Sequence, residues 1–118
     1  MTVVLDTRRW VGVGPLARLQ PERGVAVLLA GDVQVALFRT LDGTGDAVYA
    51  VHNIDPFTGV AVLSRGIVGD RAGVPTVASP LYKQVFDLTT GRCFDDPAVV
   101  LTTYPVRVVD GEIEVGLP

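Results

Sequence analysis

Short apolar runs separated by turn-forming residues follow one another along this chain. In its N-terminal half they predict four strands, at residues 10–13, 24–29, 33–39 and 47–51. Gly31-Asp32 is placed to join the second and third of these strands into a hairpin, and Asp42-Gly43-Thr44-Gly45 has the composition of a turn. The segment 15–21 begins and ends with proline, so we expect a loop there with at most one helical turn.

The C-terminal half continues in the same way. Further strands are predicted at residues 66–68, 74–78 and 85–88, followed by a hairpin of 102–109 and 112–115. The turns between them are Gly69 to Gly73 and Asp110-Gly111, and Asp95-Asp96-Pro97 is a break. Because no segment has a convincing helical pattern, we expect an all-β protein, an antiparallel sandwich or small barrel, formed by residues 1–118 as a single domain.

Composition agrees with this fold class. The 118 residues are 48% hydrophobic and 19% charged, which is too apolar for a disordered chain. The 13 glycines and 8 prolines suit a chain of short strands and turns. A chain of this length buries roughly 65% of its unfolded surface, enough for one real core.

Charge and cysteine content narrow the function classes. The net charge is −3 and no run of lysine or arginine is present, so we expect no nucleic-acid partner. No apolar run approaches the roughly 20 residues that span a bilayer, and the first residues lack the basic and apolar regions of a signal peptide. With one cysteine and therefore no internal disulfide, the expected location is the cytoplasm.

Two segments that each follow a β-rich run and contain a proline hold the candidate chemistry. We call residues 52–59 the first loop and residues 79–84 the second loop. Together they resemble the cluster-binding loops of Rieske domains, which need Cys-x-His in one loop and Cys-x-x-His in the other to hold a [2Fe–2S] cluster. In this chain Asp55 and Phe57 occupy the first pair of positions, and Ser79 and Tyr82 the second pair.

These four residues are poor ligands for an iron–sulfur cluster. A phenyl ring has no donor atom, serine and tyrosine oxygens must first lose a proton, and the carboxylate of Asp55 is a hard ligand unsuited to such a centre. Cys93 lies beyond both loops and cannot supply the missing thiolates. The resemblance therefore implies a Rieske-like fold with a degenerate cluster-binding subdomain, and we expect no metal, cofactor or catalytic residue on this chain.

Several residues of these regions have both a chemical and a structural interpretation. Asp55 could bind a metal, but a loop aspartate before Pro56 more commonly forms an Asx turn, which we favour. His52 could act as a base paired with Asp55, although a single histidine at a strand end is more often a surface or hydrogen-bonded residue. Cys93 is expected to be a buried, inert thiol, and Asp95-Asp96 a solvated turn rather than a carboxylate pair.

The aromatic replacements suggest what the loops do instead. Without a cluster to cross-link the loops, Phe57, Leu81 and Tyr82 either pack in its place or present an apolar tip to a partner, with Lys83 beside them. Proline next to each loop position lowers the entropy cost of holding the loops in place. Phe57, Leu81, Tyr82 and Lys83 are thus the candidate partner-binding residues.

A more specific resemblance covers most of the chain. The segments 53–57, 63–70 and 78–84 are similar to the small-subunit family of assimilatory NAD(P)H-dependent nitrite reductases. That resemblance implies an accessory role beside a large subunit that carries siroheme, a [4Fe–4S] cluster and FAD and reduces nitrite to ammonium in nitrate assimilation. It also implies that this chain binds and orders the large subunit without catalysing a step itself.

Two other functions remain open from the sequence. One is a free-standing interaction domain that uses the same fold for an unrelated partner, because fold does not fix function. The other is a Rieske-type electron carrier with unusual ligands, which the absence of the cysteine and histidine pairs argues against.

Overall fold

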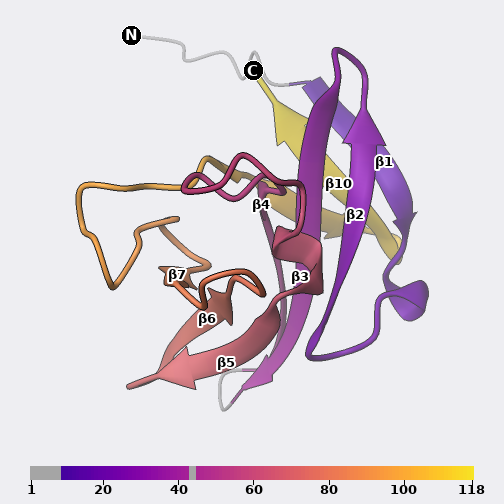
Figure 1. Cartoon of the computed structure of the whole chain (residues 1–118). Coiled ribbons are helices and arrows are strands. Elements are labelled where there is room, and N and C mark those ends of the chain that lie inside the picture. Colours follow the sequence, from indigo (N-terminus) through magenta and orange to yellow (C-terminus); the bar gives the residue numbers. More distant parts are fainter. Residues whose placement is uncertain (1–8, 43–44) are drawn as a thin grey trace, which may run out of the picture.

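The computed structural model describes residues 9–42 and 45–118, in which ten strands and two short 3₁₀ helices are present (Figure 1). The elements are β1 (Arg9–Pro15), η1 (Leu16–Arg18), β2 (Arg23–Leu29), β3 (Val33–Asp42), β4 (Gly45–His52), η2 (Leu63–Arg65), β5 (Ile67–Arg71), β6 (Val74–Ala78), β7 (Val85–Asp87), β8 (Thr103–Tyr104), β9 (Val106–Val109) and β10 (Glu112–Leu117). None of the helices in these residues has the length and apolar character needed to cross a membrane. The expectation of an all-β fold is confirmed.

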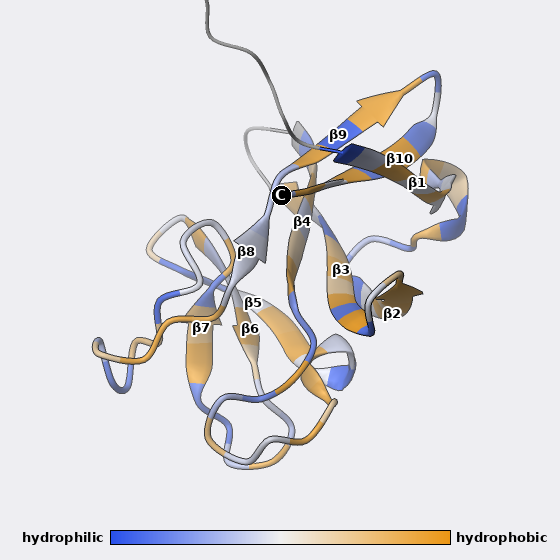
Figure 2. Cartoon of the chain, turned by 90° about the horizontal axis from the view of Figure 1, so that it is seen from above, coloured by the Kyte–Doolittle hydropathy of each residue, from blue (hydrophilic) through white to orange (hydrophobic). Residues whose placement is uncertain are grey.

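The strands form three antiparallel sheets. We call them the terminal sheet, in the order β1-β10-β9, the central sheet, β2-β3-β4-β8, and the loop sheet, β5-β6-β7. In Figure 2 the loop sheet and the terminal sheet lie on opposite sides of the long strands β3 and β4. The central sheet is therefore the middle layer of the molecule.

The middle position of the central sheet follows from the sequence of β3. Its residues 35–38 form an unbroken apolar run, and successive side chains of a strand point to opposite faces, so both faces need cover. Val35 and Leu37 belong to a buried cluster with the terminal sheet, whereas Ala36 and Phe38 belong to a cluster with the loop sheet and the segments around it. One strand thus contributes to two hydrophobic cores.

Hydropathy along the ribbon shows the same division (Figure 2). Apolar residues dominate β6, β7 and β9, whereas the turn between β9 and β10 is polar. The buried side chains that contact the loop sheet from other parts of the chain include Leu63, Leu88, Cys93 and Leu101, all at most 3% exposed. The long segment between β7 and β8 therefore closes the core beneath the loop sheet.

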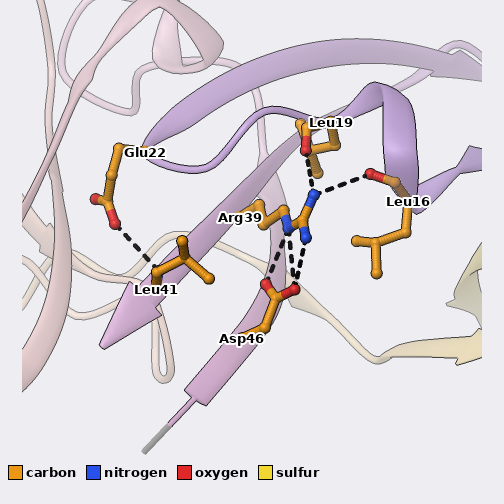
Figure 3. A network of polar contacts seen from close by, with 6 residues as sticks. All are labelled: Leu16, Leu19, Glu22, Arg39, Leu41 and Asp46. Carbon is orange, nitrogen blue, oxygen red and sulfur yellow. Dashed lines mark hydrogen bonds and ion pairs between the residues drawn. The ribbon is translucent and has the colours of Figure 1, made fainter. Parts of the chain in front are cut away.

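An arginine network fixes the segment before β2 to the central sheet (Figure 3). Arg39 on β3 donates through Nη1 to the carbonyl oxygens of Leu16, at 3.3 Å, and Leu19, at 2.9 Å. Its Nε and Nη2 atoms donate to both carboxylate oxygens of Asp46 on β4, at 2.9 and 2.7 Å. The planar guanidinium group of Arg39 makes all of these bonds at once, which the single ammonium group of a lysine could not do.

The same contact changes the titration of both partners. The hydrogen bond from Arg39 outweighs the effect of desolvation and, together with a smaller attraction between the charges, holds the pKa of the Asp46 carboxyl below its usual 3.8. The hydrogen bond to Asp46 raises the pKa of Arg39 in turn.

Since the loop 15–21 contains η1, the expectation of a loop with at most one helical turn is confirmed.

Two expectations about strand limits need correction. The predicted strand 102–109 is in fact two strands, because Pro105, which has no N–H to donate, separates β8 in the central sheet from β9 in the terminal sheet. The turn predicted at Gly69 to Gly73 is much shorter, since β5 continues to Arg71. The sequence also gave no sign of η2. The predicted turn at 42–45 includes residues 43 and 44, which lie outside the described residues.

Replacing Asp46 by asparagine tests the arginine network through its pH dependence. A carboxyl group whose folded pKa is lowered stabilises the fold above its unfolded pKa, and this contribution disappears as pH falls through the folded pKa. Urea unfolding should therefore show Asp46→Asn less stable than the parent at neutral pH, with a gap that closes in acid. Asp110→Asn, in the turn before β10, is the control; a pH-independent Asp46→Asn gap would contradict the assignment.

Candidate functional site

The first and second loops meet at two buried polar side chains. The first loop begins at the end of β4, and the second loop joins β6 to β7, so the two loops come from different sheets. Asp55 is 0% exposed and Ser79 is 1% exposed. The Ser79 Oγ hydroxyl donates to Asp55 Oδ2 at 2.5 Å, which joins residues 24 positions apart in the sequence. These are the two positions at which a Rieske domain has its cysteines.

Asp55 organises the first loop around itself. Its N–H donates to the Val60 carbonyl at 2.8 Å, and its own carbonyl accepts the Gly59 N–H at 2.8 Å. Its Oδ1 atom accepts the Phe57 N–H at 2.8 Å, which is the Asx turn that the sequence predicts. The sharp return of the chain depends on Gly59, whose φ of 74° is a conformation that glycine adopts without strain.

Ser79 organises the second loop in a similar way. Its N–H donates to the Gln84 carbonyl at 2.9 Å, and its carbonyl accepts the Lys83 N–H at 3.0 Å. Its Oγ atom also accepts the Leu81 N–H at 3.4 Å. Each loop is thus closed on the residue that occupies a cysteine position, and these two residues are bonded to each other.

Phe57 and Tyr82, which the resemblance places at the histidine positions, are exposed to solvent. Tyr82 is 71% exposed and Phe57 is 40% exposed, and Leu81 beside Tyr82 is 43% exposed. One contact with the core remains, because the Phe57 ring lies against the buried Phe86 ring with centroids 6.3 Å apart. The idea that the aromatic side chains fill the place of the cluster therefore holds for part of Phe57 only, and Leu81 and Tyr82 lie at the surface.

The donor set does not fit a [2Fe–2S] cluster. Its ligands would have to be two thiolates and two imidazoles, whereas the four positions offer a carboxylate, a hydroxyl, a phenol and a phenyl ring. The carboxylate and the hydroxyl already bond to each other and to backbone N–H groups. In the part of the chain that the structure describes, no three histidine, cysteine or acidic side chains come together as a metal site.

The remaining candidate residues take no part in a shared site. His52 is half-buried, and its Nδ1 atom has no hydrogen-bond partner among the described residues, while the oxygens of Asp55 bond to Phe57 and Ser79. His52 and Asp55 therefore do not form the hydrogen-bonded pair in which His52 would act as a general base. Cys93 is 0% exposed within the core, as expected of an inert thiol.

Acidic residues after the second loop accept hydrogen bonds from backbone N–H groups. Asp95 accepts the Val85 N–H at 2.8 Å and so ties its segment to β7, whereas Asp96 accepts the Ala98 N–H at 3.2 Å within a local turn. Burial raises the pKa of Asp87, but hydrogen bonds from Thr89 and Thr90 together outweigh it and hold that pKa below its usual value. None of these carboxylates is arranged as an acid–base pair.

The fold and the two loops define a class of protein. The chain matches the family of Rieske-like [2Fe–2S] domains over residues 9–116 and belongs to it. Within that class its relatives are more specific. It is 42% identical to the NADH nitrite reductase small subunit of Escherichia coli K12 over 106 residues, which cover 90% of this chain and 95% of the relative. The chain therefore belongs to the family of nitrite reductase small subunits, as the resemblance implied.

A solved structure and a longer relative extend this result. A Mycobacterium tuberculosis structure, described as a candidate NADH-dependent nitrite reductase small subunit, superimposes with a TM-score of 0.88 at 49% identity and covers 96% of this chain and 98% of its own. The nitrite reductase large subunit of Klebsiella oxytoca is 40% identical over 112 residues, which are 95% of this chain but 11% of that one. The same domain thus occurs alone and as a segment of a large subunit.

Ser79→Ala tests the energetic importance of the bond between the loops. It leaves a buried carboxylate oxygen without its donor, and hydrogen bonds to charged groups contribute about 1.5–3 kcal/mol, so we expect the free energy of unfolding to fall by that amount. Urea denaturation followed by tryptophan fluorescence measures it. Ser64→Ala is the matched control, because the Ser64 hydroxyl makes no hydrogen bond within the described residues. Equal losses in the two variants would contradict the expectation.

Proposed function

We propose that this chain acts as the non-catalytic small subunit of an NAD(P)H-dependent nitrite reductase and that its task is to bind and order the large subunit. The expected reaction, nitrite to ammonium in nitrate assimilation, takes place on the large subunit, which we expect to carry siroheme, a [4Fe–4S] cluster and FAD. The proposed location of the complex is the cytoplasm.

The observation that carries this proposal is the occurrence of the domain inside a longer chain. In the Klebsiella oxytoca relative, the domain is covalently joined to the rest of the large subunit. A link of this kind gives a high effective concentration without any strong contact. Where the domain is a separate chain, as in the Escherichia coli relative, a surface must replace the link. Association with the large subunit therefore accounts for both arrangements.

The chemistry of the loops supports a non-catalytic role. An electron carrier of Rieske type would need the thiolate and imidazole pairs, and the residues present do not provide them. The inner pair, Asp55 and Ser79, is withdrawn from solvent and satisfied by hydrogen bonds. What the loops still offer to a partner is their outer surface.

We propose the outer surface of the two loops as the contact with the large subunit. We call Phe57, Leu81, Tyr82 and Lys83 the tip. The first three are exposed apolar side chains, one on the first loop and two on the second, and Tyr82 is 71% exposed. Aromatic anchors commonly supply most of the binding energy of an interface, with charged groups at the rim. Lys83 adds a positive charge to this edge of an otherwise acidic chain and suits an acidic rim on the partner.

Co-purification tests the proposed partner directly. The tagged chain should retain its cognate large subunit, and NAD(P)H-dependent nitrite reduction by the large subunit should gain rate or lifetime when the chain is present. A chain that fails to bind and leaves both quantities unchanged would indicate a free-standing interaction domain with another partner.

Truncation of the tip tests the proposed surface. Tyr82→Ala should weaken binding of the large subunit by about tenfold or more, since anchor residues contribute above 1 kcal/mol, and it should leave stability nearly unchanged because the ring is exposed. Surface plasmon resonance gives the affinity. Leu28→Ala, which removes an equally exposed apolar side chain from β2, is the matched control at 69% exposure. An unchanged affinity for Tyr82→Ala and Phe57→Ala would rule out the tip.

A further inference from the structure

A continuous chain of hydrogen bonds runs between the two halves of the tip. The Phe57 N–H donates to Asp55 Oδ1 at 2.8 Å, the Ser79 hydroxyl donates to Asp55 Oδ2 at 2.5 Å, and the Leu81 N–H donates to Ser79 Oγ at 3.4 Å. Each end of this chain is the backbone of an exposed tip residue. The middle lies out of contact with water, where hydrogen bonds are electrostatically stronger and polarise one another.

From this arrangement we infer that the Asp55–Ser79 hydrogen bond is a staple that replaces the cross-linking role of the cluster and holds the tip in its binding conformation. Asp55 and Ser79 are then positioning residues for the large subunit, which they do not contact themselves. This inference rests on the proposed function and adds to it the internal device on which the binding surface depends.

The staple is placed where it decides the relative position of the loops. Among the described residues no other hydrogen bond joins the first loop to the second. The remaining bonds of Asp55 and Ser79 close each loop on itself, through Val60 and Gly59 on one side and Gln84 and Lys83 on the other. Loss of the staple would leave two closed turns that can move relative to each other.

Such movement would weaken binding without removing any contact. Tip residues that are disordered in the free chain must be ordered at binding, and each immobilised side chain then lowers the affinity. The tip spans both loops, so its shape as a single surface requires that their separation be fixed. Lys83 adopts a φ of 61°, which is uncommon outside glycine, asparagine and aspartate, so the second loop is held in a conformation that needs support.

A set of variants at the staple tests the inference on two readouts. The variants are Ser79→Ala, Asp55→Ala and the double variant, with Ser64→Ala as the control. Hydrogen exchange on the free chain should show the amides of Leu81 and Lys83 exchanging about tenfold faster in the two single variants, while the amide of Phe38 in β3 keeps its protection. A structural loss spread over the whole fold would instead raise exchange at all three amides.

Binding to the large subunit is the second readout. Each single variant should weaken it by about tenfold, as expected when one or two side chains must be ordered at binding. The loss in the double variant should be clearly smaller than the product of the two single losses, because both single variants remove the bond between Ser79 and Asp55. Asp55→Asn should stay within about threefold of the parent, since its amide oxygen still accepts the Phe57 N–H and its NH₂ group donates to Ser79 Oγ. If Ser79→Ala does not fold, Ser79→Cys provides a weak donor in its place and should give an intermediate loss.

The outcomes separate the staple from the proposed function. Unchanged exchange at Leu81 and Lys83, or faster exchange with unchanged affinity, would overturn the inference while leaving the tip as a binding surface. If the parent chain does not bind the large subunit at all, the proposed function fails and the positioning role with it, and the exchange data still decide whether the staple holds the loops together.

Discussion

One buried hydrogen bond, from Ser79 to Asp55, determines what kind of Rieske-like domain this is. The resemblance to Rieske domains equates both residues with cysteine positions, and both are withdrawn from solvent. A cluster would join the loops by metal–ligand bonds, whereas here a hydroxyl and a carboxylate join them directly. We propose that this bond allows the fold to keep its two loops together without a cluster.

The inner and outer positions of the former ligand set have separate roles. The inner pair is bonded and buried, and the outer pair, Phe57 and Tyr82, exposes aromatic rings to solvent. Binding energy and redox chemistry make different demands on a surface, and only the first can be met by apolar side chains. The two loops project from the central sheet and the loop sheet, which share one hydrophobic core through β3 and β4.

The sequence predicted the strands well because their signals are local. The apolar run of β3 and the turn residues around it indicate a hairpin without knowledge of the rest of the chain. The division at Pro105 could not be seen, because the apolar residues continue on both sides and the change of sheet depends on distant partners, β4 and β10. Extended residues at the end of β5 were likewise assigned to a turn, since glycines at both ends of the segment carry the stronger local signal.

The site was predicted in parts. The Asx turn of Asp55 is a local feature that the sequence predicts, whereas its bond to Ser79 joins residues 24 positions apart, which no local pattern connects. A sequence signal for the bond does exist, namely that an acceptor and a donor replace the two cysteines together. The exposure of Tyr82 could not be predicted, because an aromatic residue in a loop packs inward or outward according to what the neighbouring loop leaves open.

The most direct test of the account is the activity of the complex when the small subunit contains no iron. The chain would be produced in iron-depleted medium, treated with a chelator and added to the large subunit, and nitrite-dependent NAD(P)H oxidation would be compared with that given by the untreated chain. The account predicts the same gain in rate or lifetime from both preparations, since the proposed task of this chain is binding and not electron transfer. A gain that appears only after iron and sulfide are restored to the small subunit would contradict it.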